Sequence, residues 1–110
     1  MTTIVFHGVR RRDYPAQVRV IESGRARNLP TRAEVVNHSG ATGFGWGSTG
    51  PPASQLALAM CLEVTDEARA VLYHRTVARS LLANLHDDEW TLNADDVIDA
   101  LDTAEGAKQT

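Results

Sequence analysis

The sequence predicts an α+β domain in which a small N-terminal antiparallel sheet is followed by two to three helices. Residues 17–22 alternate between apolar and polar side chains, which is the pattern of a half-buried strand. Ser23-Gly24 follows directly and marks a hairpin turn, because glycine adopts the positive φ that tight turns need. Gly50-Pro51-Pro52 then begins a helix, since proline is pre-set for a first helical turn.

The N-terminal third is expected to be a meander of short strands. Residues 3–6 predict a first strand, and Gly8 to Pro15 predict a polar, arginine-rich connection. Residues 25–29 predict the strand that returns from the hairpin, and Pro30 ends it. Residues 33–37 predict one further strand.

Two longer helices are expected to follow. Residues 55–62 are apolar nearly all round, which predicts a central buried helix. Thr65-Asp66-Glu67 caps a second helix that we expect to run to about Leu85, with Arg75 and Arg79 one turn apart on it. Its predicted inner stripe consists of Val71, His74, Ala78, Leu81, Leu82 and Leu85.

The C-terminal part predicts a last short helix. A polar break at residues 86–89 is followed by Trp90-Thr91-Leu92, which leads into Asn93, a good N-cap. We expect a single domain over residues 1–104 and a flexible tail over residues 105–110. The predicted inner face of the last helix consists of Val97, Ile98 and Leu101.

Composition excludes several classes of protein. The 110 residues are 43% hydrophobic and 23% charged, which is a globular composition. The longest apolar run, residues 56–62, is far short of the roughly 20 residues of a membrane span. No secretory signal is visible, so we expect a cytoplasmic protein that contacts no membrane. Cys61 is the single cysteine and the histidines lack metal spacing, so we expect no disulfide, no metal and no cofactor.

Charge is distributed unevenly along the chain. Residues 1–50 hold seven arginines and three acidic residues, whereas residues 51–110 hold four basic and eleven acidic residues. The net charge of −3 makes nucleic acid an unlikely partner, because a binder of phosphate backbones is normally basic. The opposed charges, together with an apolar helix, predict a homo-oligomer, most simply a dimer.

The glycine-rich loop over residues 39–52 is the main candidate site. Glycines that alternate with large aromatics let a backbone approach a ligand closely, and the loop leads into a helix start. We therefore expect an anion at the start of the helix, with arginines from the strands as counter-charge and an aromatic as a flat face for a base. The alternative is that the loop packs its aromatics into the core. The candidate ligand-binding residues are Arg25, Arg27, Arg32, Phe44, Gly45, Trp46, Gly47, Ser48, Thr49 and Gly50, with Arg25 and Arg27 the leading side chains.

No catalytic arrangement is visible. The sequence shows no triad and no carboxylate pair, so we expect no enzymatic activity and assign no catalytic residues. The acidic helix face that begins at Asp95 gives an alternative function, namely a protein–protein inhibitor or adaptor of the anti-CRISPR kind that acts through the acidic helical half.

Residues 42–60 resemble part of a known protein family. They resemble a small family of unknown-function proteins with the pattern Gly-Phe-x-Trp-Gly, then Gly-Pro, then Gln-Leu-Ala-Leu-Ala. Its members are short proteins of phages, plasmids, actinobacteria and haloarchaea, and many have a Trp-x-Leu before a final helix, as residues 90–92 do here. This chain departs from the pattern at Ser48-Thr49 and at Pro52, and the family carries no catalytic assignment.

A looser similarity is one of layout only. Short phage proteins that sequester cyclic nucleotide immune signals combine a small antiparallel sheet with a few helices and arginine-rich pockets. Together with the loop, this similarity implies binding of a small anionic, nucleotide-like ligand without catalysis, as an anti-defence protein of a phage or mobile element. The partner would be that ligand or, under the alternative, a host protein.

Overall fold

The computed structural model describes residues 3–38 and 43–108, and in this part of the chain it shows one four-stranded sheet. The strands are β1 (Ile4–Arg11), β2 (Tyr14–Glu22), β3 (Arg25–Asn28) and β4 (Glu89–Asn93). Their order across the sheet is β3-β2-β1-β4, and every neighbouring pair is antiparallel. Helices follow the first three strands, so the predicted α+β class with an N-terminal antiparallel sheet is confirmed.

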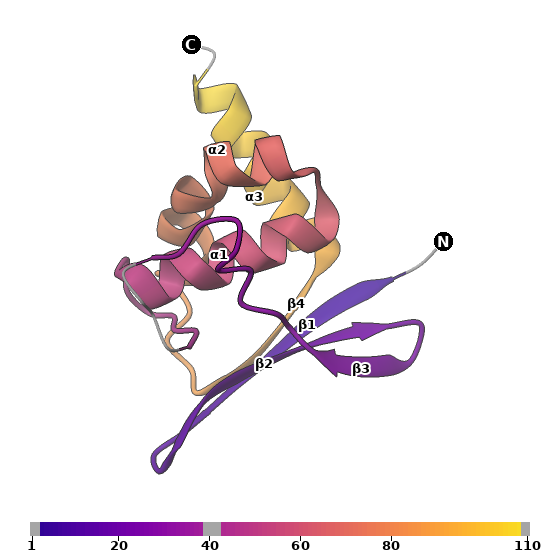
Figure 1. The fold of residues 1–110 in the computed structure, drawn as a ribbon, viewed down its shortest axis with the longest axis vertical. Helices are drawn as coiled ribbons and strands as arrows, with labels where there is room; N and C mark the ends of the chain where they lie inside the picture. Colours follow the sequence, from indigo (N-terminus) through magenta and orange to yellow (C-terminus); the bar gives the residue numbers. More distant parts are fainter. Residues whose placement is uncertain (1–2, 39–42, 109–110) are drawn as a thin grey trace.

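The helical layer has four segments in the described residues. They are α1 (Pro51–Val64), α2 (Glu67–Val77), the π-helical turn η1 (Ala78–Leu82) and α3 (Ala94–Lys108). Figure 1 shows the helices gathered on one side of the sheet, with the β1–β2 hairpin projecting away from them. The chain thus forms two layers, one of strands and one of helices.

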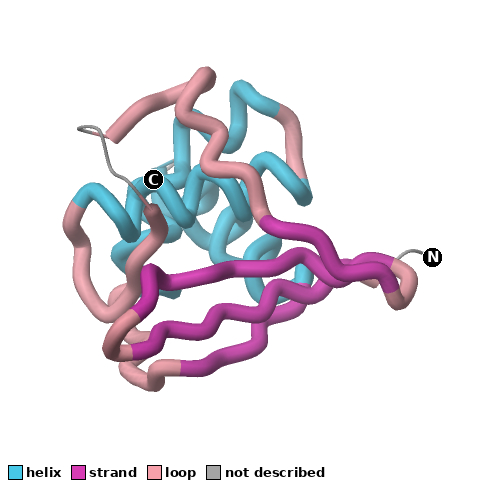
Figure 2. The backbone as a smooth tube through the Cα atoms, turned by 60° about the horizontal axis from the view of Figure 1, so that its bottom comes forward, coloured by secondary structure: helices cyan, strands magenta, loops and turns pink. Residues whose placement is uncertain are grey.

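Strand alternation decides which side chains meet the helices. Phe6, Val18, Val20 and Trp90 lie on one face of the sheet and are buried under the helical layer. The opposite face has no helix in front of it (Figure 2). Register places His7 of β1 between Arg19 of β2 and Thr91 of β4 on this outer face.

The predicted helix starts are confirmed. Asp66 accepts a hydrogen bond from the backbone N–H of Arg69 and so caps α2. Asn93 and Asp96 cap α3 reciprocally, since each side chain accepts from the backbone N–H of the other. α1 begins at Pro51, as its prolines predicted.

Several predictions about the elements were wrong. Residues 8–15 are not a connection but belong mostly to β1 and β2, with the turn at Arg12-Asp13. Residues 33–37 form no strand, because Arg32 has φ +59° and its carbonyl accepts from the N–H groups of Val35 and Val36 to make a turn. Trp90-Thr91-Leu92 lies inside β4, where pairing with β1 supplies the hydrogen bonds.

The helices also differ from expectation in length and exposure. α2 gives way to η1 after Val77, and Val71, predicted to face inward, is 40% exposed. α3 extends to Lys108, four residues beyond the predicted end of the domain at residue 104; residues 109–110 of the predicted tail lie outside the described residues.

α1 is the centre of the core. Leu56, Ala57, Leu58, Ala59, Met60 and Cys61 each have no exposed surface. The predicted central helix is therefore confirmed, and its apolar surface is used within the chain rather than left for self-association. The oligomeric state stays a prediction. None of the helices in the described ranges is long and apolar enough to cross a membrane.

Candidate functional site

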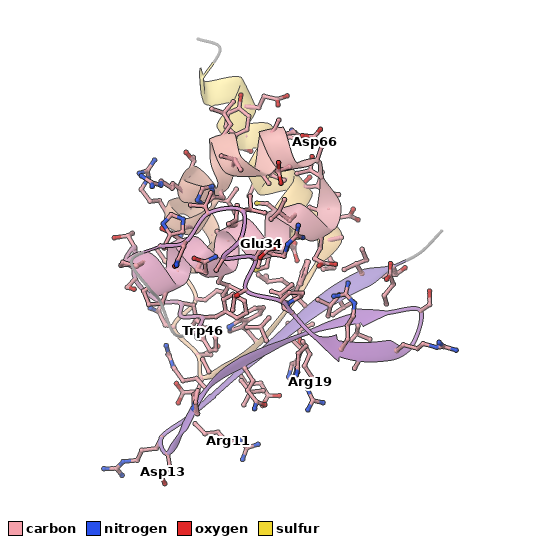
Figure 3. The ribbon with its side chains drawn as sticks, viewed as in Figure 1. Arg11, Asp13, Arg19, Glu34, Trp46 and Asp66 are labelled. Atoms are coloured by element: carbon pink, nitrogen blue, oxygen red, sulfur yellow. The ribbon has the colours of Figure 1, made fainter. Side chains whose placement is uncertain are left out.

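The described part of the glycine-rich loop is packed against the core; residues 39–42 lie outside the described residues. Trp46 is 3% exposed and meets Trp90 edge to face, with the ring centroids 5.3 Å apart. Its indole N–H donates to the carbonyl of Asp87. Figure 3 shows Trp46 between the helical layer and the sheet. This arrangement agrees with the packing alternative and leaves the indole no free face for a base.

Backbone contacts hold the loop in place. The N–H of Gly47 donates to the carbonyl of Leu82 at 2.9 Å, and Gly47 has φ +79°. The N–H of Gly45 donates to the carbonyl of Pro52 at 3.2 Å. Phe44 is half-buried and lines a separate hollow of about 190 Å³ beside β2 and β3.

The strand arginines proposed as counter-charge do not gather near Gly50. Arg27 pairs with Glu63 of α1, and Arg32 pairs with Glu34 at 2.8 Å. Arg25 is exposed on β3, at the edge of the sheet. None of the three is among the residues that line a cavity beside the start of α1.

A different pair of arginines lies beside the start of α1. An open surface cavity of about 350 Å³ is lined by His38, Thr49, Pro51, Ser54, Arg75 and Arg79, of which both arginines are exposed. We call it the α1–α2 cavity. α2 returns along α1, so its last turn and η1 bring both arginines next to the first turn of α1. Of the ten predicted ligand-binding residues, Thr49 lines this cavity and Gly50 is the N-cap of α1 at its edge. Ser48 is exposed and is not among the residues that line it.

Side chains, not free backbone N–H groups, supply the donors here. Pro51 and Pro52 have no N–H, and the N–H groups of Ala53 and Ser54 both bond to the carbonyl of Gly50. The start of α1 thus contributes partial positive charge from the helix dipole rather than open donors. The hydroxyls of Thr49 and Ser54 and the two guanidinium groups remain as donors.

Arg75 and Arg79 form no ion pair with a carboxylate within the described residues. Within the same residues, the Arg79 guanidinium donates one hydrogen bond, a long one of 3.4 Å, to the hydroxyl of Thr76. They flank the junction of α2 and η1, where the N–H of Ala83 bonds to the carbonyl of Ala78, five residues back. Such π-helical turns occur frequently at functional sites.

His38 reaches the cavity because Gln55 anchors the segment that precedes it. Gln55 is 1% exposed, and its side-chain carbonyl accepts from the backbone N–H of His38 at 2.9 Å. Its amide group donates to the carbonyls of Thr31 and Val36. The His38 ring then meets His74, and burial is the main cause that lowers the pKa of both imidazoles.

His38 was not among the predicted site residues, and the sequence indicated only the spacing of Arg75 and Arg79. That spacing of four residues was the available signal, because it places both side chains on one side of a helix. Nothing local indicated that this side would meet the start of α1, since the contact depends on how α2 packs.

Other chemistry-bearing groups have structural surroundings. Burial raises the pKa of the Cys61 thiol to about 12, which suits a core residue rather than a nucleophile. An open hollow of about 230 Å³ on the outer sheet face is lined by His7, Val9, Arg11, Gln17 and Arg19, and His7 there bonds to Glu89. Figure 3 shows Arg11 and Arg19 beyond the sheet, away from the helices. Among the described residues, no group of three or more His, Cys, Asp or Glu could hold a metal ion.

Comparison with known proteins gives one match. No curated protein and no solved structure matches the chain. A family model does match, over residues 6–103, and its span covers the sheet except for the first two residues of β1, all of α1 and α2, the α1–α2 cavity and most of α3. The match agrees with the expected membership in an uncharacterised family, and the chain belongs to DUF6166, a family of unknown function.

Proposed function

We propose that this protein binds a small anionic, nucleotide-like ligand through its phosphate in the α1–α2 cavity, and that it does so without transforming the ligand. The observation that carries the proposal is the pair Arg75 and Arg79, which line the cavity with no carboxylate partner among the described residues. Guanidinium groups suit phosphate because their forked N–H donors match its oxygens.

Both arginines are exposed to solvent, and the groups around them favour an anion beside them. Every charged side chain that lines the described cavity is basic, although the whole chain has a net charge of −3. Ser54 and Thr49 add hydroxyl donors, and the start of α1 adds partial positive charge. The volume of about 350 Å³ lies at the small end of the range for small-molecule sites, about 300–1,000 Å³, which suits a phosphate with an attached group.

Titration calorimetry with inorganic phosphate and a panel of mono-, di- and cyclic nucleotides tests this proposal. We expect Arg75→Gln and Arg79→Gln each to weaken binding by about tenfold or more, since a charge-assisted hydrogen bond contributes about 1.5–3 kcal/mol. Arg25→Gln is the matched control, because Arg25 is exposed on β3 and does not line the cavity. Equal loss in Arg25→Gln, or silence of the wild-type protein across the panel, would contradict the proposal.

An anti-defence role in a phage or mobile element is the biological setting that we propose for this binding. It is supported by the resemblance of residues 42–60 to a family that occurs in phages and plasmids. Plaque formation on a host that carries a nucleotide-signalling defence system tests this proposed role. Wild-type protein should restore plaques, and the variant with both Arg75→Gln and Arg79→Gln should not.

The alternative function is inhibition of a host protein through the acidic helical half. Part of that acidic surface is occupied by contacts within the chain. Arg69 binds both Asp102 and Glu105, and Asp96 caps α3. Asp95 and Asp99 remain exposed on α3. A stable complex with a host protein on gel filtration, formed without a nucleotide and lost on Asp95→Asn and Asp99→Asn, would favour this alternative.

A further inference from the structure

Two buried histidines meet where His38 lines the α1–α2 cavity. His38 is 9% exposed and His74 is 2% exposed, and their Nε2 atoms lie 2.8 Å apart. His74 Nδ1 lies 3.0 Å from the carbonyl oxygen of Ala70 and 2.9 Å from that of Val71. Because a carbonyl oxygen only accepts, His74 Nδ1 carries a hydrogen and its Nε2 is an acceptor when the ring is neutral. The hydrogen between the two rings therefore belongs to His38 Nε2.

This arrangement has room for one additional proton. A proton added to His38 Nδ1 keeps the hydrogen bond from His38 Nε2 to His74 Nε2 and makes it charge-assisted. A proton added to His74 Nε2 would instead set two N–H groups against each other across 2.8 Å. The first extra proton thus enters the pair at Nδ1 of His38, the member of the pair that lines the cavity.

The charged groups around the pair oppose that proton in the free protein. Burial is the main cause that lowers the pKa of both histidines; the charge of His74 lowers that of His38 next, and Arg75 of α2 is the smallest contribution that lowers both. Arg79 of η1 lines the same cavity. α1 contributes Ser54 to the cavity and Gln55 beside it, neither of which is charged. Of the described residues, no carboxylate lines the cavity to offset the two arginines.

We propose that the α1–α2 cavity selects a doubly charged oxyanion, such as a terminal phosphate, and binds it together with one proton taken up by His38. The inference rests on the proposed function and deepens it. A bound anion offsets the field of Arg75 and Arg79, so the protonated ring gains a favourable neighbour. An oxyanion with two negative charges has this effect more strongly than a phosphodiester, which carries one. The site is therefore one for phosphomonoesters in preference to phosphodiesters.

Sulfate is the first probe, because its two charges do not change across the pH range of the test. Calorimetry at about pH 7 in two buffers of different ionisation enthalpy measures the protons taken up. We expect uptake of up to one proton per sulfate, and an affinity that falls by about tenfold or more between about pH 5.5 and pH 8, since one unit of pKa shift corresponds to tenfold. The His38→Gln variant should lose the proton uptake, whereas His86→Gln, an exposed histidine, should retain it.

A second measurement covers the case in which His38→Gln fails to fold. In the wild-type protein, NMR titration of the imidazole signals should show one histidine whose pKa rises when sulfate is added. AMP and cyclic AMP at about pH 7.5 form the matched pair for ligand class, because AMP then carries a doubly charged phosphate and cyclic AMP a singly charged one. We expect AMP to bind at least about tenfold more tightly.

The outcomes separate the two proposals. Sulfate binding that is lost on Arg75→Gln but takes up no proton, or equal affinity for AMP and cyclic AMP, would overturn the inference and leave the proposed function intact. Failure of sulfate, phosphate and every nucleotide to bind would overturn both.

Discussion

The chain passes from β3 to α1 through two described segments, residues 29–38 and 43–50, and the two are held in different ways. In the first, one buried side chain, Gln55, bonds to three backbone groups. In the second, the N–H groups of Gly45 and Gly47 bond to carbonyls of α1 and η1, and Trp46 packs into the core. The long-range anchor of the first segment is thus a side chain from outside it, whereas the second segment is held by its own backbone and its own buried tryptophan.

The conspicuous segment supplies no more of the proposed site than the other one, because each contributes one lining residue, Thr49 and His38 respectively. Glycines between aromatics are easy to see in a sequence, but here they let the chain pack closely under α1 and η1. The segment that ends at His38 has no such signal, because its anchor lies 17 residues away in α1. A buried amide with three partners fixes a loop as firmly as a local motif does, without a local pattern.

Loss of the Gln55 side-chain bonds should have the largest effect. Gln55→Leu keeps the approximate size but leaves the N–H of His38 and the carbonyls of Thr31 and Val36 without their partner. Each unsatisfied buried group costs about 1–3 kcal/mol, so the free energy of unfolding should fall by about 3 kcal/mol or more. Urea unfolding measures this, with Gln17→Leu on the exposed outer face as the control.

The same variant also tests whether the hydrogen bonds of Gln55 are needed for anion binding in the α1–α2 cavity. Without urea, and at a temperature at which the variant is folded, Gln55→Leu should still weaken anion binding, because His38 loses its backbone anchor. Wild-type stability and wild-type binding in this variant would show that the first segment is held by other contacts.

Gly47→Ala should have the next largest effect. Its φ of +79° is unfavourable for a side chain, and an added Cβ would lie 3.1 Å from the carbonyl oxygen of Leu85. We expect a loss of about 1–3 kcal/mol in the free energy of unfolding. Gly43→Ala is the matched control, because a Cβ there meets nothing within 4 Å and needs no positive φ. If both variants melt at the wild-type temperature, the second segment has no special backbone.

Gly45→Ala tests the effect of a steric contact in the same segment, without the effect of a positive φ. Gly45 has no positive φ, but an added Cβ would lie 2.9 Å from the Cβ of Pro52. We expect a cost of about 1–2 kcal/mol, because the contact is with a stiff ring at the start of α1. A melting temperature unchanged from wild type would mean that the loop shifts to accept the methyl group.

The buried histidine pair should make stability depend on pH. Burial lowers the pKa of His38 and His74 in the folded protein, so the unfolded chain binds protons more readily. The free energy of unfolding should therefore be highest above the unfolded pKa of about 6.5 and fall as pH drops below it. Chemical unfolding between pH 8 and pH 5 measures this, and His74→Gln should flatten the dependence. Stability that rises over this range as the pH falls would contradict the assignment of both rings as neutral.

Local patterns in the sequence were enough for the class of fold but not for its long-range pairings. Three features were predicted because the signal for each lies within a few residues: the strand over residues 17–22, the turn at Ser23-Gly24 and the proline start of α1. β4 was missed because its hydrogen bonds come from β1, more than 80 residues away, and its own sequence begins in a polar run.

The candidate site shows the same limit. A positively charged site near the start of α1 was expected, and a cavity lined by two arginines lies there, but with arginines from the helical half rather than the strands. The count of charges by half pointed to side chains that do not line this cavity. Arg27 and Arg32 have carboxylate partners, whereas Arg75 and Arg79 lack them within the described residues. Pairing, which decides whether a charge is available to a ligand, is not visible in a sequence.

The smallest effect should come from a third link between the sheet and α1. Arg27 of β3 hydrogen-bonds to Glu63, and this bond is the main cause that raises the pKa of the arginine. The Arg27 side chain is 46% exposed, so water screens the pair, and Arg27→Gln should lower the free energy of unfolding by about 1 kcal/mol at most. Anion affinity should not change, since Arg27 lies outside the α1–α2 cavity. A tenfold loss of affinity in Arg27→Gln with no loss in Arg75→Gln would indicate that the anion binds at the strands and not in the α1–α2 cavity. Compared with Gln55→Leu, this variant measures how much more the buried neutral amide of α1 contributes than the partly exposed ion pair that α1 makes with the sheet.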